Sequence, residues 1–122
     1  FDTTANGKPS SWKAPYTDGF NWPKMMHISW IVLDDQYKLV EDYNCQIKPD
    51  GYSLSEEALE RSGEEKEKFE NGDQLLDVLA KFNESLEKVQ YIISFNLNFN
   101  ENIIAAEYHR DGQKNPLLFV DK

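Results

Sequence analysis

Two short stretches of the chain carry residues that could hold a metal ion or a phosphate group. The first is Phe1-Asp2-Thr3-Thr4-Ala5-Asn6-Gly7, and the second is Ile92-Ile93-Ser94-Phe95-Asn96-Leu97-Asn98-Phe99-Asn100. Each has the pattern of a strand end running into a turn, which is where α/β proteins place their chemistry. Asp2 supplies a carboxylate that could coordinate a hard divalent cation, whereas Thr4 and Asn100 supply neutral oxygens, which are weaker ligands.

Other chemistry is poorly represented. The sequence has no Ser-His-Asp order, no Cys-His pairing, no phosphate-binding glycine loop and no cysteine-rich metal spacing. We expect His27, within a strand, and His109, late in a helix, to be packed or surface residues, and Cys45 to belong to the core. Asn96 has two interpretations: it could hydrogen-bond a ligand, or it could cap the helix that follows.

The first fifty residues predict a β-hairpin preceded by a short strand and a long connection. Alternating polar and apolar residues around Tyr43 and Cys45 have the period of two that is typical of a strand with one buried face. The proline-rich connection contains Trp12 and Trp22, which we expect to anchor it to the body of the protein. The expected segments are a strand at 1–4, the connection at 8–23, a strand at 25–33, a turn at 34–37 and a strand at 39–48.

The remainder of the chain predicts helices separated by one buried strand. A capping-box pattern at 53–56 predicts a short helix beginning near residue 54, and the Glu-rich stretch that follows is typical of a solvated helix face. Residue 91 begins a short apolar run, typical of a buried parallel strand. The expected segments are an amphipathic helix at 75–89, the parallel strand at 91–95, a helix at 99–110 that Gly112 ends, and a strand or packed tail at 117–120.

Taken together, these elements predict an α/β fold with a mixed β-sheet and flanking helices, formed by a single domain of residues 1–122. The net charge of −9 argues against strong non-specific binding of nucleic acid. No apolar run is long enough to span a membrane, so we expect no membrane partner. A single cysteine and the lack of an export signal favour a cytoplasmic location.

The order and spacing of these segments resemble the DEDD-type 3′–5′ exonuclease superfamily, which includes proofreading subunits and ribonuclease T. In that family the first strand ends in Asp-x-Glu followed by Thr-Thr-Gly or similar, and here it reads Asp2-Thr3-Thr4-Ala5-Asn6-Gly7. A second motif, His-Asn-x-x-Phe-Asp, is matched by Phe95-Asn96-Leu97-Asn98-Phe99-Asn100. The resemblance runs through essentially the whole chain and implies a ribonuclease H-like fold that is incomplete at both ends.

The resemblance also implies a chemistry. Two Mg²⁺ or Mn²⁺ ions, roughly 4 Å apart, would clamp the phosphate at the 3′ end of a single-stranded nucleic acid. Asp2 would bridge the metals, position 4 would hold a metal-binding Glu, and position 100 would hold an Asp. Thr3, Asn96 and Phe99 would contact the substrate. The family's third motif, with a general base and the last Asp, would follow residue 122.

The sequence departs from this pattern at the residues that matter most for catalysis. Thr4 stands where the family has Glu, Asn100 stands where it has Asp, and Glu64 lies in the loop that contacts the nucleotide. One carboxylate cannot neutralise two closely spaced divalent ions, so weak or absent metal binding is expected. Three hypotheses follow: an exonuclease, a non-catalytic nucleic-acid-binding module, or a protein-interaction module on the exonuclease scaffold.

Overall fold

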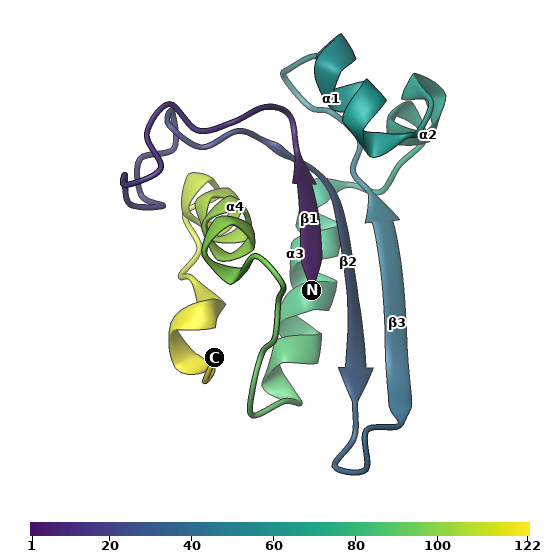
Figure 1. Ribbon diagram of the computed structural model, residues 1–122, viewed down its shortest axis with the longest axis vertical. Helices are drawn as coiled ribbons and strands as arrows, with labels where there is room; N and C mark the ends of the chain where they lie inside the picture. The colour runs from purple at the N-terminus through teal and green to yellow at the C-terminus, as the bar shows by residue number, and fades with distance from the viewer.

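The computed structural model describes all residues from Phe1 to Lys122. It has a three-stranded antiparallel sheet in the order β1-β2-β3 and four α-helices (Figure 1). The strands are β1 (Asp2–Ala5), β2 (Met25–Leu33) and β3 (Leu39–Gln46). The helices are α1 (Glu56–Ser62), α2 (Lys66–Glu70), α3 (Leu75–Glu87) and α4 (Leu97–Arg110), followed by a 3-10 turn, η1 (Pro116–Phe119).

The predicted hairpin is confirmed. In β2 the apolar residues Ile28, Trp30 and Val32 are buried, while the residues between them face outward. Trp30 stacks on Tyr43 of β3, its cross-strand partner, with 4.7 Å between ring centroids. Period-two burial on paired strands therefore gives the sheet one inner, apolar face.

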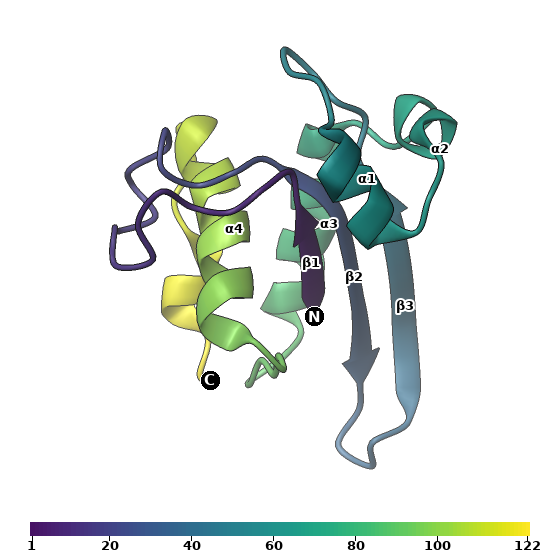
Figure 2. The same cartoon turned by 45° about the horizontal axis from the view of Figure 1, so that its top comes forward.

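Helix α3 covers the inner face, and α4 lies beside β1 (Figure 1). The main core joins the inner face of the sheet to both helices and includes Phe82, Ile103, Ile104 and Tyr108. Helices α1 and α2 form a separate group at one end of the sheet (Figure 2), where Met26, Ala58 and Phe69 make a small second cluster. No helix covers the outer face of the sheet.

The predicted parallel strand at 91–95 is wrong, and so is the mixed sheet that depended on it. Both strand pairings are antiparallel, and the parallel contacts are two single bridges, Ile47 with Asp73 and Tyr91 with Asp121. The backbone of the segment makes one hydrogen bond beside β1, at Phe1, the residue before the strand, whose amino group donates to Ile93 O at 2.8 Å before the chain turns into α4. One hydrogen-bonded position cannot make a ladder. Ile92 alone is buried, while Ile93 and Phe95 are exposed.

Smaller differences concern the helix ends. Helix α1 begins at Glu56 rather than near residue 54, because Ser55 supplies the cap by accepting from Ala58 N at 3.1 Å. Helix α4 starts at Leu97, two residues earlier than expected. Gly112 follows its C-terminus with φ 73°, as the predicted end of the helix requires. The tail forms η1, with Leu117 buried, rather than a strand. No helix has both the length and the hydrophobicity needed to cross a bilayer.

Candidate functional site

The two stretches singled out by the sequence meet at the free edge of β1, where Asn100 joins them. The Asn100 side chain is 1% exposed, and all of its polar atoms are used. Its Oδ1 accepts from Thr3 N at 3.1 Å and from Thr3 Oγ1 at 2.7 Å. Its Nδ2 donates to Asp2 Oδ1 at 3.2 Å and to Ser94 Oγ at 2.7 Å. The amide is therefore held by four hydrogen bonds to three residues.

The Asn100 side-chain amide accepts a hydrogen bond that a neighbouring strand would otherwise accept from β1. The Thr3 N–H points away from β2, and a buried backbone donor must find a partner. Asn100 Oδ1 provides it, while the Ser94 hydroxyl donates to Phe1 O at 2.7 Å. An amide suits this place because it offers an acceptor on one side and two donors on the other. An aspartate would present only acceptors to Asp2 and Ser94.

Asp2 and Thr4 lie on the outer face of the sheet. Their cross-strand partners in β2 are Ser29 and His27, so these four residues alternate away from the core. Asp2 is exposed, and one of its two oxygens is occupied by the Asn100 amide. His27, directly opposite Thr4, makes a hydrogen bond with the side chain of Asn44. This hydrogen bond therefore holds the His27 imidazole against β3.

The three residues expected to contact a substrate occupy different positions. The Thr3 side chain is buried and donates inward to Asn100. Asn96 occupies the N-cap position of α4, but its exposed side chain makes no capping hydrogen bond. Phe99 is half-buried and packs against Trp12, with 5.5 Å between ring centroids. The ring of Phe99 therefore helps to hold the 8–23 connection, which Trp22 also anchors from within the core.

The side chains at this site do not fit a pair of closely spaced divalent ions. No group of three or more His, Cys, Asp or Glu residues is arranged to hold a metal anywhere in the structure. At β1, the atoms that face Asp2 Oδ1 are the hydrogens of the Asn100 amide, which carry partial positive charge. Hard cations need anionic or carbonyl oxygens at 2.0–2.6 Å instead. The Asn100 N–H therefore occupies one oxygen of Asp2 and offers no ligand to a cation.

A second polar cluster lies two turns further along α4. Glu107 is 2% exposed and accepts from Met25 N at 3.1 Å through Oε2, while Oε1 pairs with Arg110. Arg110 also donates to Gly19 O at 2.9 Å and to Trp22 O at 3.0 Å. Burial and the Glu107 carboxylate raise the pKa of the nearby Tyr52 to about 12. The Glu107–Arg110 pair therefore holds the 8–23 connection against α4.

Two residues of the site were not singled out from the sequence as functional. Ser94 links Asn100 to Phe1, but a serine in an apolar run carries no distinct signal. Asp42 faces outward opposite Ile31, and period-two alternation in β3 could have placed it on the same face as Asp2. Glu64, expected to repel a nucleotide, pairs with Lys68 at 2.9 Å, and the hydrogen bond raises the pKa of that lysine.

Comparison with known proteins yields no relative for this arrangement. No protein-family model, curated protein or solved structure matches the chain.

Proposed function

We propose that this chain is a ribonuclease H-like domain of DEDD-exonuclease type that has lost catalysis and acts as a non-catalytic binding module. One observation carries the proposal: the buried Asn100 amide is hydrogen-bonded to Asp2 and Thr3 through all of its polar atoms. An amide held in this way cannot release its oxygen to a metal without leaving Thr3 N–H unpaired, which costs about 1–3 kcal/mol.

The charge distribution favours protein over nucleic acid as the binding partner. The net charge is −9, and Asp2 and Asp42 both lie on the open face of the sheet. Affinity for nucleic acid depends on clustered Lys and Arg that replace counterions along the phosphates.

The single cysteine, Cys45, is buried and free, which suits the reducing cytoplasm in which we place the protein.

The proposal is tested by restoring the two missing carboxylates. Thr4→Glu and Asn100→Asp would add two anionic ligands beside Asp2, because residues 2 and 4 of a strand share one face, roughly 7 Å apart. In EDTA the three carboxylates should repel one another and lower the melting temperature of the double variant below that of the parent. Millimolar Mn²⁺ should raise the melting temperature again. At a hundred times its dissociation constant, Mn²⁺ would add about 2.7 kcal/mol to the free energy of unfolding.

The parent protein should show no metal-dependent stabilisation and no release of nucleotides from a single-stranded 3′ end. Asp42→Asn is the matched control, since it changes an outer-face carboxylate that Asn100 does not touch. Metal-dependent degradation of an oligonucleotide by the parent, abolished by Asp2→Ala, would overturn the proposal in favour of an active exonuclease. A double variant that melts at or above the parent temperature in EDTA would show that these positions do not cluster.

A further inference from the structure

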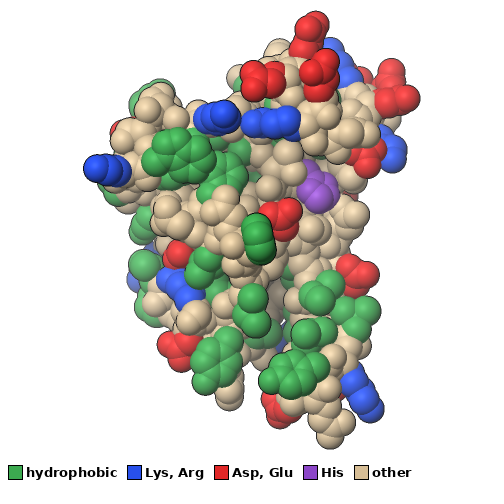
Figure 3. All heavy atoms as spheres, viewed as in Figure 1, with side chains coloured by type: hydrophobic (Ala, Val, Ile, Leu, Met, Phe, Trp, Pro, Cys, Tyr) green, Lys and Arg blue, Asp and Glu red, His purple; other side chains and the backbone are tan.

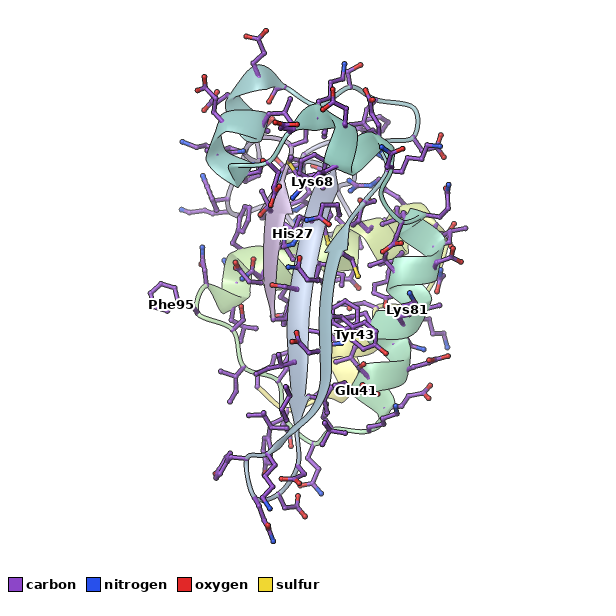
Figure 4. The ribbon with its side chains drawn as sticks, turned by 90° about the vertical axis from the view of Figure 1, so that its right-hand side faces the viewer. His27, Glu41, Tyr43, Lys68, Lys81 and Phe95 are labelled. Atoms are coloured by element: carbon purple, nitrogen blue, oxygen red, sulfur yellow. The ribbon has the colours of Figure 1, made fainter.

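The outer face of the sheet carries large apolar side chains that nothing in the chain covers. Ile31 on β2 is 56% exposed, and Ile93 and Phe95 in the segment beside it are 84% and 106% exposed. Figure 4 shows Phe95 projecting on the side opposite α3, and Figure 3 shows hydrophobic side chains gathered over the β2–β3 hairpin. Exposed apolar residues clustered in this way mark interaction surfaces more often than isolated ones do.

A shallow groove runs between these residues. It has a volume of about 410 Å³ and lies between the 93–95 segment and the paired strands β2 and β3. Apolar side chains including Phe1, Ile31 and Phe95 line it, together with the carboxylates of Asp2 and Asp42 and the polar groups of Ser29 and Asn44. No Lys or Arg lines the groove.

Neither carboxylate of the groove pairs with a Lys, Arg or His side chain, and the Phe1 ammonium beside Asp2 donates to Ile93 O instead. The five ion pairs of the structure involve neither Asp2 nor Asp42. Asp2 accepts one hydrogen bond, from Asn100, through a single oxygen. An apolar surface that also presents unpaired carboxylates is complementary to a ligand with apolar side chains and a positive charge.

We propose that this outer-face groove binds a segment of a partner protein that combines apolar side chains with Lys or Arg. The apolar side chains would pack on Ile31, Ile93 and Phe95, and a cation would lie between Asp2 and Asp42. This proposal rests on the binding role proposed above, but it depends on side chains other than Thr4 and Asn100. The nuclease and metal assays therefore fail or succeed independently of the binding assay.

Two other occupants fit less well. A nucleic acid strand would bring phosphates towards Asp2 and Asp42, which is repulsive at the low salt where such binding is strongest. A second copy of this chain, packed face to face about a two-fold axis, would present the same acidic groups to one another. A cationic peptide segment is the only one of the three that neutralises the carboxylates.

The test uses three synthetic peptides of equal length: alternating Leu-Lys, alternating Leu-Glu and alternating Ser-Lys. Each is titrated into the ¹⁵N-labelled full chain, and the amide shifts are followed by NMR. The Leu-Lys peptide should bind at least about tenfold more tightly than either of the others, which corresponds to about 1.4 kcal/mol. Its shifts should centre on Asp2, Ile31, Asp42 and Phe95.

The variants Ile31→Ser and Phe95→Ser should each weaken Leu-Lys binding about tenfold, because each removes an exposed apolar anchor and leaves the core intact. Asp42→Asn should weaken it less. Phe119→Ser is the matched control, since Phe119 is also an exposed phenylalanine but lies on η1, and it should change nothing. Equal binding of Leu-Lys and Leu-Glu, tight binding of a single-stranded oligonucleotide at the same amides, or a homodimer that Phe95→Ser dissociates would each overturn the proposal.

Discussion

The two ends of α4 make contrasting contacts with the sheet. Asn100 and Glu107 are seven residues apart, so they lie on nearly the same side of the helix. Asn100 joins β1 through a neutral amide with four hydrogen bonds. Glu107 joins β2 through a buried carboxylate that the Arg110 guanidinium accompanies. Both clusters are satisfied, but only the second contains a charge on α4.

The contrast teaches what this fold needs in order to bury an acid. At Glu107 the chain provides its own cation, three residues further along the helix. At position 100 the ionised side chain in contact is another carboxylate, Asp2, and no Lys or Arg joins the cluster, so an acid there would lack the partner that Glu107 has. The amide needs no such partner, and we regard the neutral end of α4 as the form of the site that is stable without metal.

Breaking the charged end should have the largest effect. Glu107→Gln leaves the partly buried Arg110 without its carboxylate and should lower the free energy of unfolding by about 3 kcal/mol. Urea unfolding followed by tryptophan fluorescence measures it. Lys66→Ala, which removes one partner of an exposed pair with Glu70, is the control and should cost less than about 0.5 kcal/mol. Equal costs for the two variants would mean that the buried pair contributes no more than a surface one.

Adding a charge to the neutral end should have a smaller effect. Asn100→Asp replaces two donors with an acceptor facing Asp2 and should cost about 2 kcal/mol at neutral pH. Burial and the Asp2 carboxylate should raise the pKa of the introduced carboxyl group in the folded state, so the deficit should shrink as the pH falls through that raised pKa and be gone below the unfolded value of about 4, because the protonated group becomes a donor. Chemical unfolding at several pH values measures both. A deficit that stays constant with pH would show that the loss does not come from the added charge.

The smallest effect should come from Asn96→Ala. Asn96 stands at the N-cap of α4, where an asparagine commonly contributes about 1 kcal/mol. Its side chain makes no capping hydrogen bond, so the change should stay within about 0.5 kcal/mol. Ser55→Ala, at the cap of α1, should cost about 1 kcal/mol because Ser55 does accept from Ala58 N. Reversal of this order in the same unfolding assay would contradict the cap geometry.

Elements with a strong period could be predicted from the sequence. The β2–β3 hairpin and α3 follow from alternating and amphipathic patterns, because each pattern already states which face is buried. The 91–95 segment could not be placed in this way. An apolar run predicts a buried strand only if another element covers it. Here the segment's backbone makes one hydrogen bond beside β1, to Phe1, the residue before the strand. Ile93 and Phe95 therefore remain exposed, although their residue types suggest burial.

The candidate site could be predicted in part. The sequence placed Asp2, Thr3 and Asn100 at one site, and the structure brings the three into contact. From the sequence alone, Asn100 is interpreted only as a weakened metal ligand. The hydrogen bond to Ser94, and with it the role of the amide in closing the edge of β1, depends on how the turn before α4 packs against Phe1. Residue spacing alone does not predict packing between segments so distant in sequence.

The contact between Asn100 and Thr3 has a consequence for self-assembly. Sheets polymerise into fibres by adding strands at both of their open edges. Here Asn100 occupies the Thr3 N–H at the free edge of β1, and Ile93 O and the Ser94 hydroxyl occupy the main-chain groups of Phe1, whereas β3 forms the other edge of the sheet. Two copies joined through β3 would leave only their β1 edges, where the Asn100 side chain stands in the way of a further strand. We therefore expect any strand-to-strand association of this protein to end at a pair.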